Sequence, residues 1–296
     1  MPSTAAASAG SEVSSRRRVP DVVTGAGGGE LPVRVISAVV LAPLALGAAY
    51  VGGWPFVLLC ALAACGIWWE WAALSAGRGA NMLVAVGAGA LIVATGLVIA
   101  SWIAAALACL CVGALVVAAM TASKDRAWIG AGVLYAGAML VAPVVLRNDP
   151  HEGFVAIVFL FAVVWATDTV AYFVGRAAGG PKLAPRMSPN KTWSGALGGA
   201  CGAVIAAATV AAVAKLNHGT VLALVGLGLS VASQAGDLFE SAVKRRYGAK
   251  NAGQLIPGHG GLMDRLDGFI AAALVAAILG VLRGGPEAPA RGLTVW

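Results

Sequence analysis

The sequence predicts an all-α protein, a polytopic bundle of about nine membrane-spanning helices, on three observations. Of the 296 residues, 59% are hydrophobic and 11% are charged, whereas a soluble domain carries about 25% charged residues. The apolar residues come in runs of about 20, the length that crosses a hydrocarbon core about 30 Å thick. Most basic residues lie in the short segments between these runs. Chain length therefore counts membrane spans here, and not soluble domains.

The first stretch, 1–31, is rich in Ala, Ser and Gly and shows no apolar periodicity. This composition predicts a disordered tail. The three arginines at 16–18 are not followed directly by an apolar run, which argues against a cleavable signal peptide, and we interpret them as a topology anchor. We divide the rest into scaffold helices, 32–150, and a region, 151–296, that holds two charged loops.

Nine apolar segments follow, and each is predicted to be one helical span: 33–53, 55–75, 82–100, 102–121, 127–146, 153–175, 194–214, 219–240 and 267–282. The division inside 82–121 is the least marked, since only Ser101 and Trp102 interrupt the run. At about 1.5 Å per residue the run is too long for one crossing and fits two.

The distribution of basic residues tests this count. With nine spans and the tail inside, 16 of the 20 Lys and Arg residues fall on the inner side, and the outer four are Arg147, Lys215, Arg283 and Arg291. A single crossing by 82–121 would change the split to 9 against 11. We therefore expect a multi-pass protein of the plasma membrane, with the N-terminus and both charged loops in the cytoplasm.

Composition argues against nucleic-acid binding and against sites built from cysteine. The net charge of +7 comes from short loops between spans, so nucleic acid is not an expected partner. The five cysteines all lie in apolar runs, which is typical of small buried hydrophobes and not of disulfides or a metal site.

The densest group of charges lies near the last two spans. On a helix over 219–244, one face carries two carboxylates, a hydroxyl and an ammonium, namely Asp237, Glu240, Ser241 and Lys244. The next span begins near Asp264 and Asp267. Placing each charged side chain in the membrane costs about 2.5–3.5 kcal/mol on insertion scales, so we expect these groups to have a function. Converging carboxylates suit Mg²⁺, and an ion pair such as Glu240 with Lys244 is the alternative.

Between these spans, the loop 251–263 contains Pro257-Gly258-His259-Gly260-Gly261. Glycines allow close backbone approach, and free N–H groups before a helix form a cradle for an anion. Lys250 and Arg265 flank the loop, which favours phosphate as the anion.

A second basic patch, 176–193, contains Arg176, Lys182, Arg186 and Lys191, with Ser188 and Thr192 as hydroxyl donors. Topology anchoring alone is the alternative role for its cations. Asp168 lies in the preceding apolar segment and needs a partner. We expect Arg176, two turns further on, to supply it.

Glu70 lies within Trp68-Trp69-Glu70-Trp71, at the end of a predicted span. Tryptophans gather at membrane interfaces. We therefore interpret Glu70 as an interfacial residue whose carboxylate reaches water.

The two charged stretches resemble the signature of the phosphatidate cytidylyltransferases, also called CDP-diacylglycerol synthases. The residues that carry the resemblance are Ser241, Lys244-Arg245, Lys250, Pro257-x-His259-Gly260-Gly261, Asp264-Arg265-x-Asp267, the upstream Lys182-Leu183-Ala184-Pro185-x-x-Ser188-Pro189-x-Lys191-Thr192-Trp193, Asp168 and Gly198-Gly199. The resemblance covers about 160–270. It departs at Asn251, where the family usually has Asp, and we interpret Asn251 as a turn residue.

The resemblance implies an enzyme that makes CDP-diacylglycerol and pyrophosphate from CTP and phosphatidate in a lipid membrane, with Mg²⁺ as cofactor. As catalytic residues we assign Asp237, Lys244, His259, Asp264 and Arg265. As substrate contacts we assign Ser188, Lys191, Thr192, Ser241, Arg245, Lys250, Gly260 and Gly261. As metal ligands we assign Asp237 and Asp264, with Asp168, Glu240 and Asp267 as further candidates. A second metal ion and a homodimer are left open.

Two other functions are weighed. A transporter also places carboxylates near cations in the membrane, but it should show a repeat or helices broken at mid-span, and these acids lie near span ends. A CDP-alcohol phosphotransferase would concentrate several Asp at fixed spacing on one helix, whereas this chain spreads its acids over two or three spans.

Overall fold

Short connections join helices along most of the described chain. The computed structural model describes residues 30–77, 80–122, 124–249, 252–253 and 260–296. Its helices are α1 (Glu30–Val51), α2 (Gly53–Ser75), α3 (Asn81–Ile99), α4 (Ile103–Ala119), α5 (Arg126–Arg147), α6 (Gly153–Ala178), α7 (Trp193–Val213), α8 (Gly219–Arg246), α9 (Met263–Gly284) and α10 (Pro289–Thr294). Two strands, β1 (Lys182–Ala184) and β2 (Ser188–Thr192), lie between α6 and α7.

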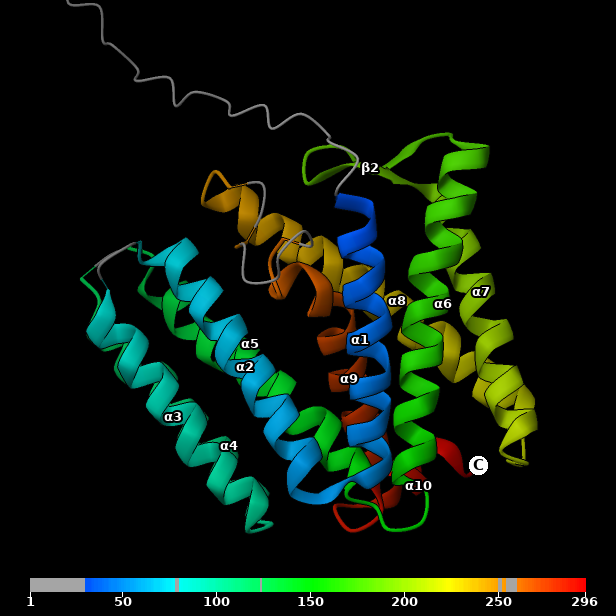
Figure 1. Cartoon of the computed structure of the whole chain (residues 1–296), viewed down its shortest axis with the longest axis horizontal. Coiled ribbons are helices and arrows are strands. Elements are labelled where there is room, and N and C mark those ends of the chain that lie inside the picture. The colour runs from blue at the N-terminus through cyan, green and yellow to red at the C-terminus, as the bar shows by residue number, and fades with distance from the viewer. Residues whose placement is uncertain (1–29, 78–79, 123, 250–251, 254–259) are drawn as a thin grey trace, which may run out of the picture.

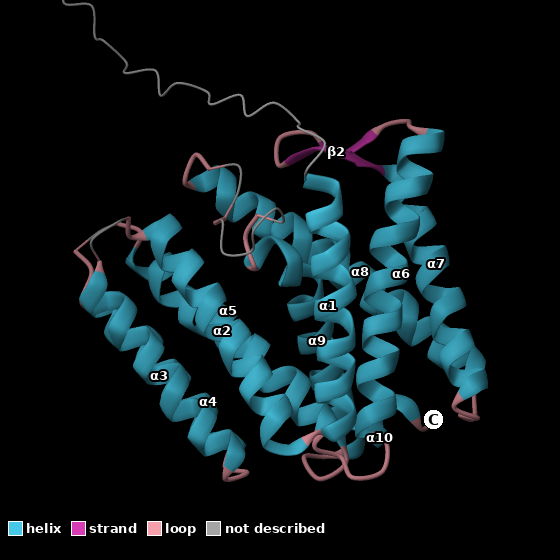
Figure 2. Ribbon diagram, in the orientation of Figure 1, coloured by secondary structure: helices cyan, strands magenta, loops and turns pink. Residues whose placement is uncertain are grey.

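The predicted all-α membrane bundle is confirmed (Figure 2). Each predicted span lies within or nearly within one helix. The run 82–121 divides into two helices as expected, because α3 ends at Ile99 and α4 begins at Ile103. In the described part of the chain, seven helices are long and apolar enough to cross a membrane, while α4 and the segment Val40–Val51 of α1 are shorter apolar helices. The count of nine spans is therefore approximate.

The loop predicted at 176–193 is partly a hairpin. β1 and β2 pair antiparallel, with Lys182 opposite Thr192 and Ala184 opposite Ser188. The sequence does not predict strands there, because β1 has only three residues and shows no apolar alternation. The hairpin brings Lys191 of the second patch to α8, where it pairs with Asp237.

The charged segments meet at one end of the bundle (Figure 1). The hairpin, the end of α8 and the start of α9 lie at the same end as the start of α1, whereas α10 lies at the opposite end. α9 occupies the middle, packing against α2, α5, α6 and α8. The two segments that carry the sequence motifs therefore lie at the same end of the bundle, as the count of nine spans predicts.

Small residues on α7 let it pack closely on α6. A Cβ atom at Gly199 would lie 2.8 Å from the carbonyl oxygen of Thr167, and one at Gly195 would lie 2.8 Å from that of Ala171. Only glycine permits such an approach between helix backbones. This contact places the start of α7, and β2 before it, beside the end of α6.

We expect Gly199→Leu to destabilise the protein by at least about 2 kcal/mol, because overpacking against a neighbouring backbone forces the helices apart. Heating of the detergent-purified protein, followed by size-exclusion chromatography, measures the change as a lower midpoint. Gly228→Leu on α8 is the matched control, since no atom lies within 4 Å of a Cβ there. Equal midpoints for the two variants would contradict the packing.

Asp149 holds the opposite end of the bundle together. Its Oδ1 accepts from the backbone N–H groups of His151 at 3.1 Å and Glu152 at 3.3 Å, and its Oδ2 accepts from that of Arg291 in α10 at 3.0 Å. Burial alone would raise the pKa of this carboxyl, but the three N–H donors and the Arg291 guanidinium outweigh it and hold the pKa below its usual value. The charged form of Asp149 therefore stabilises the docking of α10.

A carboxyl with a lowered pKa contributes stability above its ordinary pKa of about 3.9 and loses it as the pH falls through the folded value. We therefore expect Asp149→Asn to be less stable than the parent at pH 6–7, with the difference shrinking below about pH 4. Thermal midpoints of both proteins across this range measure the effect. A difference that grows on acidification would contradict this role.

Candidate active site

A charged cavity lies at the end of the bundle where the motifs meet. Its volume is about 780 Å³, and residues from α6, α7, α8, α9 and the hairpin line it. Its acidic lining residues are Asp168, Asp237, Asp264 and Asp267, and its basic ones are Arg176, Lys182, Lys191 and Arg265. The fold thus brings both sequence motifs to one place.

Close crossing of α8 and α9 sets the acidic side of this cavity. A Cβ at Gly236 would lie 2.6 Å from the carbonyl oxygen of Asp267, and one at Gly268 would lie 2.5 Å from the hydroxyl of Ser233. Glycine at both positions therefore lets the helices approach. Asp237, next to Gly236, lies close enough to this crossing to act electrostatically on Asp267.

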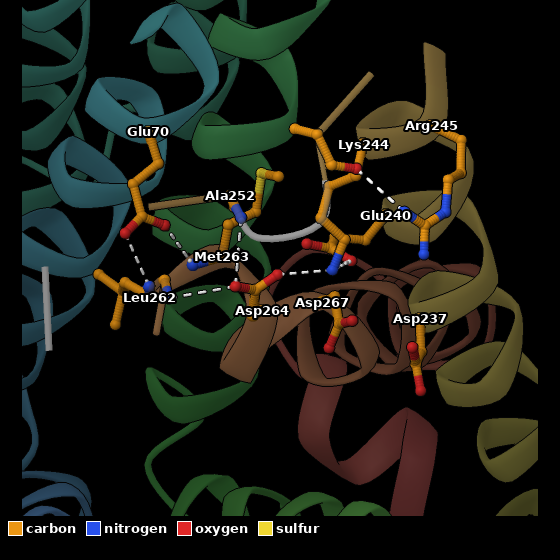
Figure 3. Close-up of polar contacts among 12 residues, drawn as sticks. Glu70, Asp237, Glu240, Lys244, Arg245, Ala252, Leu262, Met263, Asp264 and Asp267 are labelled. Atoms are coloured by element: carbon orange, nitrogen blue, oxygen red, sulfur yellow. Dashed lines mark hydrogen bonds and ion pairs between the residues drawn. The ribbon is translucent and has the colours of Figure 1, made fainter. Parts of the chain in front are cut away.

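Lys244 joins α8 to α9. Its Nζ atom lies 2.5 Å from Glu240 Oε2 and donates a hydrogen bond of 2.6 Å to Asp264 Oδ1 (Figure 3). Glu240 is 1% exposed and does not belong to the lining of the cavity, as far as the described residues define it. The ion pair that the sequence left as an alternative for Glu240 is therefore present.

Asp237 pairs with a different lysine. Lys191 of β2 forms an ion pair with Asp237 Oδ2, so the hairpin contacts α8 there. The expectation that Asp237 and Lys244 share a helix face holds, but seven residues separate them by about 10 Å along the axis. The two groups consequently contact different partners, and Figure 3 shows Asp237 set to one side of the contact between Lys244 and Asp264.

Asp168 and Asp267 complete the acidic side. Asp168 interacts electrostatically with Asp237 and Lys191, and so does Asp267. Asp267 is buried and accepts from the N–H of Gly268 at 2.7 Å. The expected pairing of Asp168 with Arg176 is not what the structure shows: Arg176 donates to the Tyr172 hydroxyl at 3.0 Å, and Lys191 is the cation that acts on Asp168.

Asp264 organises the backbone before α9. Its Oδ2 accepts from the N–H groups of Ala252 at 3.3 Å and Gly261 at 3.1 Å, while Oδ1 takes Lys244. Gly260 has φ +85°, a conformation that favours glycine. The predicted cradle of N–H groups at 260–261 thus exists in part, and Asp264 itself fills it.

The sequence interpretation of Glu70 is also wrong. Its side chain does not reach water; it is 1% exposed and accepts from the backbone N–H groups of Leu262 at 2.9 Å and Met263 at 2.8 Å. These are the first N–H groups of α9, which need acceptors. The same argument that demanded a partner for Asp168, the cost of an intramembrane carboxylate, could have found Glu70.

Several assigned substrate contacts have local roles. Thr192 Oγ1 accepts from the N–H of Gly195 at 3.1 Å and caps α7, a common role for Thr at this position. Arg245 donates to the carbonyl oxygens of Ala249 and Met187. Ser188, Ser241 and Arg245 lie outside the cavity lining that the described residues give. Lys250, Asn251 and His259 fall outside the described residues, so their assigned roles stay predictions.

The metal-ligand assignment also stays a prediction. Among the residues that the structure describes, no three His, Cys, Asp or Glu side chains converge closely enough to hold a metal ion by themselves. Three of the candidate acids form ion pairs with lysines instead. Asp237 pairs with Lys191, and both Asp264 and Glu240 pair with Lys244.

Comparison with known proteins gives strong matches. A family model described as "Cytidylyltransferase family" matches residues 32–282. Proteins called phosphatidate cytidylyltransferase from Brucella suis biovar 1 and Brucella melitensis biotype 1 are each 44% identical over 261 residues, 88% of this chain and 96% of theirs. One from Bacillus subtilis is 35% identical over 144 residues, 48% of this chain and 54% of its own length.

Proposed function

This chain belongs to the cytidylyltransferase family, and we propose that it transfers the cytidylyl group of CTP to phosphatidate, giving CDP-diacylglycerol and pyrophosphate. The match over residues 32–282 confirms the resemblance read from the two motifs. It favours this membrane enzyme over a transporter or a CDP-alcohol phosphotransferase. The observation that carries the proposal is the cavity in which acids of three helices face the basic hairpin, within an apolar bundle.

The reaction exchanges one phosphate bond for another. An oxygen of the phosphatidate phosphate attacks the α-phosphorus of CTP, a new P–O bond forms, the bond between the α-phosphorus and the bridging oxygen breaks, and pyrophosphate leaves with that electron pair. The attacking phosphate is already ionised, so the reaction requires no strong general base. The protein's task is to position the phosphates and neutralise their charge.

Cations of the cavity would contact these phosphates. Lys191 and Arg265 line the cavity, and Lys244 lies beside it on Asp264. Electrostatic stabilisation of this kind is strongest where bound substrate excludes water from the site. Thr192 contributes by capping α7, which fixes the end of the hairpin that carries Lys191.

The acids at this site fit a divalent cation by their chemistry. Mg²⁺ binds carboxylate oxygens and uses one or two of them together with substrate phosphates, so three converging acids are not required. We assign Asp237 and Asp264 to it, with Asp168 and Asp267 beside them. Glu240 is omitted, because it is buried and paired with Lys244. When bound, the ion supplies positive charge against the phosphate oxygens.

We also propose that the protein lies in the plasma membrane and that its cavity opens to the cytoplasm. One support is the excess of basic residues on the predicted inner side, which includes the segments at this end of the bundle. The other is that CTP is soluble in water and would reach the site from the cytoplasm. Apolar helices around the cavity would admit the lipid phosphate from the bilayer. The homodimer stays a prediction.

We expect Asp237→Asn and Asp264→Asn each to lower turnover at least about 100-fold, or about 2.7 kcal/mol of barrier. Each removes a negative charge opposite metal and phosphate without a change of shape. Pyrophosphate release from CTP and phosphatidate by purified protein at saturating Mg²⁺ measures the effect.

Asp125→Asn is the control for these variants. Asp125 pairs with Arg246 at 2.5 Å at the same end of the bundle, but it is not among the residues that line the cavity. Its turnover should stay within about threefold of the parent. Near-normal turnover of either Asp237→Asn or Asp264→Asn would exclude the role assigned to that residue.

Orientation is tested by labelling single cysteines in intact cells, after the five native cysteines have been replaced. Cysteines at Arg186 and Ala249 should be shielded from an impermeant thiol reagent, whereas cysteines at Asn148 and Asn217 should react, because the two pairs lie on opposite sides of the predicted topology. The reverse labelling pattern would show that the cavity faces outward.

A further inference from the structure

The carboxylate of Glu70 links α2, in the N-terminal half of the chain, to the start of α9 beside the candidate active site. Glu70 of α2 accepts the backbone N–H groups of Leu262 and Met263, which lie 192 and 193 residues further along the chain. In Figure 3 its carboxylate points at the start of α9, on the side opposite Lys244. α2 also packs against α9.

The energetics favour a specific role for this contact. A carboxylate that is 1% exposed is costly unless hydrogen bonds compensate it. The start of a helix offers that compensation twice, through N–H groups without helical acceptors and through the positive end of the helix dipole. Hydrogen bonds from N–H groups to a charged acceptor are among the stronger ones.

The chain makes room for this carboxylate with glycine. A Cβ at Gly253 would lie 2.6 Å from Glu70 Oε1, and its three nearest neighbours would all be side-chain atoms of Glu70. At Gly261 a Cβ would lie 2.9 Å from Glu70 Oε2 and 2.9 Å from Asp264 Oδ2. The backbone around 253 and 261 thus closes directly on the carboxylates of Glu70 and Asp264.

The two carboxylates hold adjacent parts of one segment. Glu70 takes the N–H groups of Leu262 and Met263, and Asp264 takes those of Ala252 and Gly261. Asp264 and Arg265 follow immediately and line the cavity. A shift of the start of α9 would therefore move both of these side chains with it.

We propose that Glu70 is a positioning residue for the cytidylyl transfer: it fixes the start of α9, and so sets the places of Asp264 and Arg265 in the cavity. The inference rests on the proposed function. It gives the first half of the chain, which the sequence predicts only as scaffold, a direct part in the geometry of the site.

Glu70→Gln tests the proposal with little change in size. The amide keeps one acceptor oxygen but turns an NH₂ group toward a backbone N–H and removes the charge. We expect kcat/KM for CTP, per folded molecule, to fall at least about tenfold. Hydrogen exchange at the amides of Leu262 and Met263 should accelerate at least about tenfold, while exchange in the middle of α8 stays unchanged.

Asp149→Asn is the matched control. Asp149 is also buried and also accepts backbone N–H groups, but at the opposite end of the bundle. Measured near neutral pH and well below the thermal midpoint, its kcat/KM should stay within about twofold of the parent. A loss in Glu70→Gln that merely reflects lower stability would appear in Asp149→Asn as well.

Gly253→Ala supplies a second variant that leaves all charges in place. Its new methyl group would displace the carboxylate of Glu70, so we expect at least a fivefold fall in kcat/KM and the same faster exchange at Leu262 and Met263. Gly89→Ala is its control, because no atom lies within 4 Å of a Cβ there. If Glu70→Gln does not fold, Gly253→Ala decides.

Three results would overturn the inference: a Glu70→Gln protein within twofold of the parent, equal losses in Glu70→Gln and Asp149→Asn, or unchanged exchange at Leu262 and Met263. Failure of the proposed function looks different. There the parent itself would release no pyrophosphate from CTP and phosphatidate, and the exchange measurement alone would then decide whether Glu70 holds the start of α9.

Discussion

A charge inside this apolar bundle must be paired, because hydrocarbon surroundings penalise an unpaired ion by several kcal/mol. The structure meets this requirement through contacts between elements that are distant in sequence. Lys191 of the hairpin pairs with Asp237 of α8, and Lys244 of α8 pairs with Asp264 of α9. Glu70 of α2 accepts N–H groups of α9. The contacts that neutralise these charges are therefore the same contacts that hold the elements of the site together.

The pairs also explain why the site lies where it does. The start of α9 needs hydrogen-bond acceptors, and Glu70 of α2 supplies them to Leu262 and Met263. Asp264, in the first turn of α9, accepts from the preceding N–H groups of Ala252 and Gly261. Close packing at Gly236 and Gly268 then brings α8 near enough for its acids to face α9. The result is a cavity with acids on one side and the cations of the hairpin on the other, which suits a reaction between two phosphates.

Local patterns in the sequence predicted the two segments whose residues line the cavity. Apolar runs of the right length predicted the helices, and helical spacing placed Asp237 and Lys244 on one face. Motif resemblance joined the stretches around Lys191 and Asp264. The interpretation of Glu70 was wrong, because a tryptophan-rich context is typical of a membrane interface. Spacing along one helix suggested Arg176 as the partner of Asp168, whereas Lys191 of the hairpin is the cation that acts on it electrostatically.

Hydrophobic length, charge distribution and two motifs by themselves determined the class of fold, the region of the site and the family. These are properties of local sequence, since the period of a helix and the thickness of a bilayer are fixed in advance. Tertiary structure alone decided which lysine pairs with which acid, that Thr192 caps α7, and that Glu70 holds the start of α9. Such choices depend on how helices cross and which side chains then come within about 3 Å of one another, and no pattern along the chain encodes a contact between residues 70 and 262.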